Sequence, residues 1–320
     1  AVGVMLRGAL LALAFALIPP ALQAAEPFSF GVLGDIPYNR FERQHLPRLL
    51  AEMDAEGLRV VVHDGDLKNG GERCDDALYA DRLALFEASH TPFVFVPGDN
   101  DWTDCHRNNN GGYDPVERLA RLREVFFARP GQTLGRYPLE VDSQAGDAAF
   151  GAYREHLRWQ IGPVLFVTLN VPGGGNNIGR QPQPSAEFTS RSAALRAWIG
   201  AAFSRARAQR LEGVVLIQQA NPDLEDFSAG RGGRAYRDLL GQLLAESQAF
   251  AGEVLLVHGD SHVHRFDQPL RDPASGKTQT NFTRLETWGS PFMGWVKVDV
   301  APGARPLFRV TPRMYTARGN

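Results

Sequence analysis

Four short apolar runs in this chain end in the same dipeptide, Gly-Asp, and this repeated ending constrains the fold more than any other feature. The four endings are Gly34-Asp35, Gly65-Asp66, Gly98-Asp99 and Gly259-Asp260. Glycine permits a tight turn directly after a strand. The carboxyl ends of parallel strands lie side by side at one edge of a sheet, where open α/β sheets bind ligands. We therefore expect the four carboxylates to lie within a few ångströms of one another.

Carboxylates gathered in this way repel one another and cannot all stay ionised unaided. A bound multivalent cation compensates such a group of like charges. A single Gly-Asp is more often only a turn or a helix cap. Four of them at strand ends, the last followed by His262, instead favour a metal site.

The rest of the chain alternates strand-like and helix-like patterns, which predicts an α/β fold with a parallel sheet. Strands are predicted at 28–33, 59–62, 92–96, 164–170, 213–218 and 253–257. Helices are predicted between them at 41–56, 75–88, 115–127, 186–207 and 234–247. After residue 258 a mostly antiparallel run is expected, with strands at 282–287, 294–300 and 307–311. No linker or repeat divides this pattern, so residues 26–320 are predicted to form a single domain.

Residues 1–25 are not expected to belong to the fold. Arg7 precedes an apolar run from Ala9 to Ile18, which Pro19 and Pro20 end, and an alanine-rich stretch follows. One positive charge, a short apolar core and small residues at the exit are typical of a secretory signal peptide. The run is too short to cross a bilayer. We expect an exported protein, periplasmic or secreted, without a stable membrane anchor.

Export changes the interpretation of the two cysteines, Cys74 and Cys105. Thiols pair in oxidising compartments, and each cysteine lies a few residues beyond a Gly-Asp ending, so the two could meet across neighbouring loops. A disulfide there would stabilise the fold by about 3 to 4 kcal/mol. The alternative is two unpaired, small, buried side chains.

Acidic and basic residues are nearly balanced, with 34 Lys and Arg against 36 Asp and Glu. A chain without a strong positive field is not expected to bind nucleic acid by bulk charge. Nothing in the sequence indicates the oligomeric state.

The order of these motifs resembles that of the calcineurin-like metallophosphoesterases, over nearly the whole length after residue 25. The blocks of that family run D-x-H, G-D, G-N-H-[DE], a lone H and G-H-x-H, each after a strand. Here the same order is kept by Gly34-Asp35-Ile36-Pro37, Gly65-Asp66, Gly98-Asp99-Asn100-Asp101, Gln218-Gln219 and Gly259-Asp260-Ser261-His262. The resemblance implies a four-layer αββα sandwich, in which helices flank two mixed β-sheets. It also implies a dinuclear metal site where an activated water hydrolyses phosphate esters.

Carried over by position, the resemblance implies Asp66 as the ligand that bridges two cations. It implies Asp35 and His262 as ligands of the first cation, and Asp99 and Asp260 as ligands of the second. Gln219 is the expected counterpart of the lone histidine, with Gln218 as the alternative because the strand register is open by one residue. His264 is an alternative ligand beside His262. His258 lies two residues before Asp260 on the same strand face and is expected to support the ligands.

Four family histidines are replaced in this chain, by Pro37, Asn100, Gln219 and Asp260. Proline offers no ligand atom, so Tyr38 or Asn69 is expected to fill the position of Pro37. The remaining donors are mostly oxygens. An oxygen-rich site favours two hard divalent cations, Mn²⁺ or Mg²⁺ foremost. Ca²⁺, Fe and Zn²⁺ are the alternatives.

Asn100 stands where the family has the histidine that protonates the leaving group. His106, Arg107 and Lys68 are therefore candidates to supply a proton or a positive charge at the leaving oxygen. Imidazole is the side chain best suited to donate a proton near neutral pH. For His106 the alternative is a simple exposed loop residue.

These observations predict a metal-dependent phosphoesterase or phosphatase that acts on a small phosphate ester. The replacement at Asn100 supports a second hypothesis, a catalytically silent relative that keeps the fold and acts as a binding protein. A serine hydrolase is not expected, because the chain lacks a G-x-S-x-G element.

Overall fold

The computed structural model describes residues 25–317. The predicted signal peptide therefore lies outside the described residues, apart from Ala25. Within residues 25–317, no helix combines the length and the apolar character that a membrane span requires.

The first of two β-sheets has five strands in the order β12-β11-β1-β2-β3. These are β12 (Phe308–Met314), β11 (Gly294–Val300), β1 (Phe28–Leu33), β2 (Val61–His63) and β3 (Phe93–Phe95). The strands β1, β2 and β3 are parallel and are joined by the helices α1 (Arg40–Asp54) and α2 (Asp76–Glu87). This confirms the predicted alternation of parallel strands and helices at the start of the chain. The strand β11 pairs antiparallel with β1, which makes the sheet mixed.

The second sheet has seven strands in the order β4-β5-β6-β7-β8-β10-β9. These are β4 (Asp142–Ser143), β5 (Leu157–Ile161), β6 (Val164–Thr168), β7 (Gly213–Ile217), β8 (Glu253–His258), β10 (Phe282–Glu286) and β9 (Arg265–Asp267). The four strands β6, β7, β8 and β10 are parallel. Because β8 belongs to this sheet, the Gly-Asp endings come from two sheets rather than from the edge of one.

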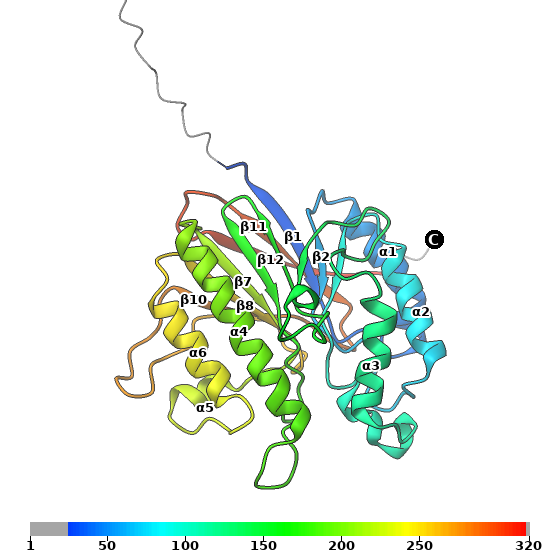
Figure 1. Cartoon of the computed structure of the whole chain (residues 1–320). Helices are drawn as coiled ribbons and strands as arrows, with labels where there is room; N and C mark the ends of the chain where they lie inside the picture. Colours follow the sequence, from blue (N-terminus) through cyan, green and yellow to red (C-terminus); the bar gives the residue numbers. More distant parts are fainter. Residues whose placement is uncertain (1–24, 318–320) are drawn as a thin grey trace, which may run out of the picture.

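Helices cover the outer faces of both sheets (Figure 1). On one side lie α1, α2 and α3 (Pro115–Phe126), and on the other lie α4 (Ala186–Ala208) and α6 (Arg237–Gln248), with the short α5 (Leu224–Ser228) beside α6. One core cluster joins side chains of both sheets with those of α1 to α3, whereas a second lies between the seven-stranded sheet and α4 to α6. The layers therefore run α, β, β, α, as expected from the resemblance.

Local signals explain where the first helix lies. Asn39 caps α1 by accepting a hydrogen bond from the backbone N–H of Glu42, as short polar side chains do at helix N-termini. Leu46, Leu49, Leu50 and Met53 are buried at helical spacing along one face. By contrast, β4, β5, β9 and α5 were not predicted. In β5 the buried and more exposed residues alternate, a signal too short and too polar to stand out.

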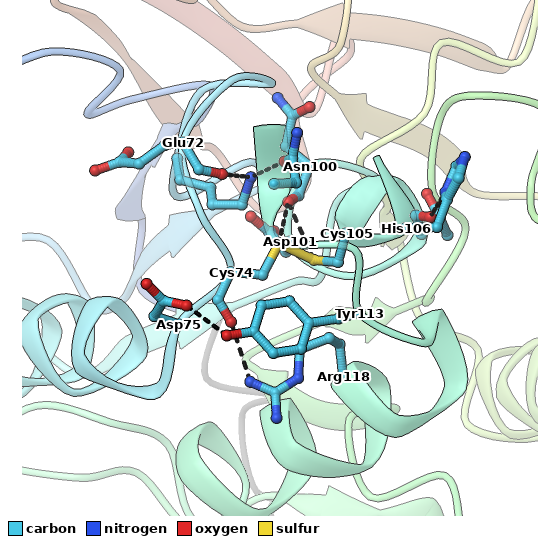
Figure 2. Close-up of a disulfide and its surroundings, with 12 residues drawn as sticks. Glu72, Cys74, Asp75, Asn100, Asp101, Cys105, His106, Tyr113 and Arg118 are labelled. Carbon is cyan, nitrogen blue, oxygen red and sulfur yellow. Dashed lines mark hydrogen bonds between the residues drawn. A yellow bond between two sulfur atoms is a disulfide. The ribbon is translucent and has the colours of Figure 1, made fainter. Parts of the chain in front are cut away.

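The predicted disulfide between Cys74 and Cys105 is present, with Cα atoms 5.8 Å apart. It ties the loop after β2 to the short 3₁₀ helix η1 (Thr103–His106), and Figure 2 shows it directly below Asn100 and Asp101. The two sulfur atoms lie 3.7 and 3.9 Å from the backbone oxygen of Asn100. The bridge therefore fixes the loop that carries Asp99 and Asn100 against the loop that follows Asp66.

Candidate metal centre

The aspartates that follow β1, β2 and β8 adopt an unusual backbone conformation. The φ angles of Asp35, Asp66 and Asp260 are 51°, 58° and 78°. This left-handed region is uncommon for residues other than glycine and is found where the surrounding structure holds a functional group in place. Each strand thus ends in a sharp turn, and the carboxylates of these turns share hydrogen-bonding partners across the two sheets.

Direct contacts link the four carboxylates into one group, here called the carboxylate cluster (Asp35, Asp66, Asp99 and Asp260). The backbone N–H of Asp260 donates to Oδ2 of Asp35 at 3.0 Å. The backbone N–H of Asn100 lies 3.0 Å from Oδ1 of Asp66 and 2.9 Å from Oδ1 of Asp99. The cluster therefore combines three carboxylates of the five-stranded sheet with one of the seven-stranded sheet.

Gly173, in the loop after β6, lies against the carboxylates of Asp99 and Asp260. A Cβ atom added there would lie 2.9 Å from Oδ2 of Asp99 and within 3.0 Å of both carboxylate oxygens of Asp260. Its backbone N–H also donates to Oε1 of Gln219 at 2.6 Å. A space bounded by two carboxylates and kept open by a glycine suits a cation. Gly173 was not among the predicted site residues, and its only sequence signal is the Gly173-Gly174-Gly175 run at a strand end.

Burial and mutual repulsion raise the pKa values of the cluster. Burial, followed by repulsion from Asp99, raises the pKa of Asp66 well above its usual range. Burial and the neighbouring Asp260 raise the pKa of Asp99 to about 7. Burial likewise raises the pKa of Asp260 to about 6. Among the described residues, the ion pair that the cluster forms is that of Asp35 with His262, at 3.4 Å.

His262 is oriented as a metal-binding histidine would be. Its Nδ1 lies 2.7 Å from the backbone oxygen of Ser290, which directs Nε2 toward Asp35. Histidine ligands of metals commonly hold the second nitrogen in this way. The hydrogen bond with Asp35 raises the pKa of His262 to about 9. Because a ligand imidazole must be neutral, a cation bound here would displace that proton.

The alternative residues, Gln219 or Gln218 and His262 or His264, lie in different surroundings. Nε2 of Gln219 lies 3.3 Å from Oδ2 of Asp66 and 3.4 Å from Oδ1 of Asp99. The side chain of Gln218 turns away and donates to the backbone oxygen of Ala220. His264 also turns away from the cluster, because its Nδ1 lies 2.9 Å from the backbone oxygen of Glu286.

His258, the last residue of β8, is fully buried two residues before Asp260. Its Nδ1 lies 2.9 Å from the backbone oxygen of Gly259, the residue that precedes Asp260. Burial lowers the pKa of this imidazole to about 4, so the ring is neutral at physiological pH. His258 therefore contacts the turn that presents Asp260.

Of the two residues expected to replace the ligand at Pro37, Tyr38 reaches the cluster. Its hydroxyl oxygen lies 3.3 Å from Oδ1 of Asp35 and 3.1 Å from Oδ2 of Asp66. Asn69 instead donates from its side-chain amide to the backbone oxygen of Tyr38. Asn69 thus braces the tyrosine from behind.

The candidates for a role at the leaving group lie at different distances from the cluster. Asn100 contacts the cluster directly, since its amide nitrogen donates to Oδ2 of Asp66 at 2.9 Å. Arg107 is about half exposed and pairs with Asp104 at 2.8 Å. His106 is exposed, with Nδ1 2.7 Å from the backbone oxygen of Thr103. Lys68 is fully buried, and its ammonium group donates to two backbone oxygens and to Oδ1 of Asn110. The charge of Lys68 therefore stabilises the neighbouring loop.

Asp101 supports the cluster without belonging to it. Its carboxylate accepts hydrogen bonds from the backbone N–H groups of Asp66, Leu67 and Gly98 at 2.7 to 2.9 Å. Burial raises the pKa of this side chain to about 6, although these hydrogen bonds oppose the shift. Asp101 thereby joins the turns after β2 and β3. It occupies the acidic position that ends the G-N-H-[DE] block.

The donor chemistry of the cluster fits hard divalent cations, because carboxylate oxygens are the ligands such ions prefer. Among residues 25–317, however, no group of three or more His, Cys, Asp or Glu side chains is arranged to hold a metal ion by itself. A cation in the cluster would therefore need ligands of another type as well, from neighbouring side chains or from water.

No family model and no curated protein sequence matches this chain. Solved structures do match it. A dimetal phosphatase from Danio rerio is 15% identical, with a TM-score of 0.55 over 85% of this chain and 93% of that one. A structure described as PhoD is 12% identical, with a TM-score of 0.53 over 94% of this chain and 74% of the other. GAP50, described as the anchor in the inner membrane complex of Plasmodium, is 10% identical, with a TM-score of 0.52 over 90% and 84%.

At these identities the likeness extends to the fold, and it agrees with the two mixed sheets and with the motifs at their strand ends. The chain therefore has the calcineurin-like metallophosphoesterase fold.

Proposed function

We propose that the protein is a divalent-cation-dependent phosphoesterase that hydrolyses small phosphate esters. One observation carries the proposal. Four carboxylates from the strand ends of two sheets meet in a single cluster, and Asp66, Asp99 and Asp260 have raised pKa values caused by burial and mutual repulsion. A fold seen in a dimetal phosphatase and in PhoD supports placing two cations there.

When bound, the two cations would supply positive charge for the phosphoryl oxygens and a water that loses its proton readily. Asp66 shares a hydrogen-bonding partner with Asp35 and another with Asp99, and it would be shared by both cations. Asp35 and His262 would hold the first cation, and Asp99, Asp260 and Gln219 would hold the second. We assign this site to Mn²⁺ or Mg²⁺ because most of its donors are oxygens.

The chain's own residues would act on the leaving oxygen. Asn100 carries no proton that it can give up, so it would position the ester by hydrogen bonding. A Cβ atom added to Gly70 would lie 3.1 Å from Oδ1 of Asn100 and 3.7 Å from Nη1 of Arg107. The guanidinium of Arg107 therefore lies near Asn100, and we propose that it would neutralise developing negative charge there. His106, exposed on the same loop, is the candidate proton donor.

The test is hydrolysis of an aromatic phosphate monoester and diester with Mn²⁺ or Mg²⁺. We expect Asp66→Ala to lower kcat/KM by about two to three orders of magnitude, because both cations lose a ligand. Asp272→Asn, a change at a partly exposed residue outside the cluster, is the matched control and should retain activity.

A second candidate function, a catalytically silent binding protein, is favoured by one residue, Asn100, which stands where the family has its proton-donating histidine. GAP50, described as an anchor, has a similar fold. Absence of turnover with every cation, in a parent protein that still binds Mn²⁺, would favour this candidate over the enzyme.

We also propose that the protein is exported to the periplasm or secreted. The buried disulfide between Cys74 and Cys105 supports this proposal, since disulfides persist in oxidising compartments. Fractionation of cells that express the full chain, with sequencing of the mature N-terminus, tests it. An uncleaved cytosolic chain with reduced cysteines would contradict export.

A further inference from the structure

We propose that the phenol oxygen of Tyr38 is a ligand of the first cation and takes the position that Pro37 cannot fill. The inference rests on the proposed function, because it assumes that the carboxylate cluster binds divalent cations. It assigns the first cation to Asp35, Asp66, His262 and Tyr38.

The separations between these side chains suit ligands of one ion. The phenol oxygen is 3.3 Å from Oδ1 of Asp35 and 3.1 Å from Oδ2 of Asp66, and Nε2 of His262 is 3.4 Å from Oδ1 of Asp35. Hydroxyl groups that donate to carboxylates usually lie about 2.5 to 2.7 Å away. Adjacent ligands bound at about 2.1 Å are about 3.0 Å apart in an octahedral site and about 3.4 Å apart in a tetrahedral one. The phenol donates hydrogen bonds to both carboxylates in this structure, and the three separations also fall within the range of edges of a coordination polyhedron.

The composition of the site points in the same direction. Within the described part of the chain, His, Cys, Asp and Glu side chains alone form no group of three or more that could hold a metal ion. The phenol of Tyr38 would therefore complete a ligand set that Asp35, Asp66 and His262 do not complete alone. The oxygen of Tyr38 lies against both Asp35 and Asp66, and a phenol oxygen is a hard donor like a carboxylate.

Contacts at both ends hold Tyr38 in this place. Its backbone N–H donates to Oε2 of Glu42 at 2.6 Å, and its backbone oxygen accepts from the side-chain amide of Asn69. The ring packs edge-on against the imidazole of His262, with centroids 5.3 Å apart. The amide nitrogen of Asn100 donates to the phenol oxygen at 3.1 Å. The phenol is thus fixed before any cation binds, as a ligand should be.

The experiment compares the parent with Tyr38→Phe and Tyr38→His, using Mn²⁺ as the probe. Tyr153→Phe is the matched control, because the Tyr153 hydroxyl bonds Ser190 and lies away from the cluster. Calorimetric titration and elemental analysis after dialysis give affinity and stoichiometry. We expect Tyr38→Phe to weaken one of two Mn²⁺ sites about 10- to 100-fold, while Tyr38→His, which supplies an imidazole, restores it. Tyr153→Phe should bind two ions like the parent.

A spectroscopic readout keeps the test independent of how well the variants fold. In the parent, adding Mg²⁺ should change the near-ultraviolet difference spectrum in the way expected when a phenol oxygen binds a cation, and Tyr153→Phe should give the same change. Two Mn²⁺ sites of unchanged affinity in Tyr38→Phe, or no phenol signal in a cation-loaded parent, would overturn this inference alone. A parent that binds no Mn²⁺ would overturn the proposed function and this inference together.

Discussion

Glu155 and the cluster residues Asp66 and Asp99 are buried carboxylates that differ in one respect, the presence of an Arg partner. Glu155 is fully buried and accepts hydrogen bonds from two guanidinium nitrogens of Arg123 and from the amide of Asn170. Burial by itself would raise the pKa of Glu155, but Arg123 overcomes that effect and the pKa falls to about 2. In the carboxylate cluster, burial and repulsion raise the pKa values of Asp66, Asp99 and Asp260 instead.

The difference separates a structural carboxylate from one prepared for a ligand. The fold provides Glu155 with its own counter-charge, so this residue needs nothing from outside. Asp66 and Asp99 form no ion pair with Lys or Arg among the described residues, although more than thirty such cations are present in the chain. A bound divalent cation would be the missing partner.

Removing the carboxylate that pairs with Arg123 should have the largest effect on the free energy of unfolding. Glu155→Ala leaves the guanidinium of Arg123 buried without its acid, and we expect it to lower the free energy of unfolding by about 3 to 5 kcal/mol. Urea denaturation measures this loss. The Mn²⁺ affinity of the folded variant should be unchanged, since Glu155 lies outside the cluster. A loss near zero would show that the ion pair is not structural.

The pH dependence of the free energy of unfolding should also report the Glu155–Arg123 pair, with a somewhat smaller effect. The pKa of Glu155 is lowered in the folded state to about 2, against an ordinary value of about 4.3. A lowered carboxyl pKa stabilises the fold above the unfolded pKa, and this contribution is lost as pH falls through the folded pKa. Between about pH 5 and pH 2 the parent should therefore lose about 3 kcal/mol relative to Glu155→Gln. Unfolding of both proteins across this range measures the difference, which parallel curves would contradict.

Adding a divalent cation should stabilise the fold by binding to the carboxylate cluster. At a concentration one hundred times its Kd, Mn²⁺ should raise the free energy of unfolding by about 2.7 kcal/mol for each occupied site. We expect the same increase in Glu155→Gln and little or none in Asp66→Asn. Thermal unfolding with Mn²⁺ or with a chelator tests this. Equal stabilisation of Asp66→Asn and the parent would place the binding elsewhere.

The sequence was sufficient for much of the architecture because its signals were local. Three apolar runs ending in Gly-Asp gave the parallel strands β1, β2 and β3, and helical spacing gave the helices between them. The pairing of β11 with β1 depends on contacts between distant segments, and so does the position of β8, the strand before Asp260, in the second sheet. No local pattern encodes those contacts.

The candidate site was predictable to the same extent. Their position at strand ends identified the four aspartates as candidates. Gln219 and Gln218 differ by one residue of strand register, and the sequence does not show which side chain faces the cluster. Gly173 acts through a close approach of its backbone to Asp99 and Asp260. That role depends on three-dimensional packing, so a glycine-rich loop alone could not reveal it.

The smallest expected effect gives the sharpest comparison, because its sign is opposite to that of Glu155. Burial and the charge of Asp260 oppose ionisation of Asp99 and raise its pKa to about 7. In cation-free protein at about pH 8, Asp99→Asn therefore removes an unfavourable charge. The amide can still accept the hydrogen bond of the Asn100 backbone N–H. We expect it to stabilise the fold by about 1 kcal/mol, whereas Glu155→Gln should destabilise it. Urea denaturation in chelator measures both variants side by side. If Asp99→Asn instead lost stability as Glu155→Gln does, Asp99 would be a structural residue, and the distinction between the two groups of carboxylates would fail.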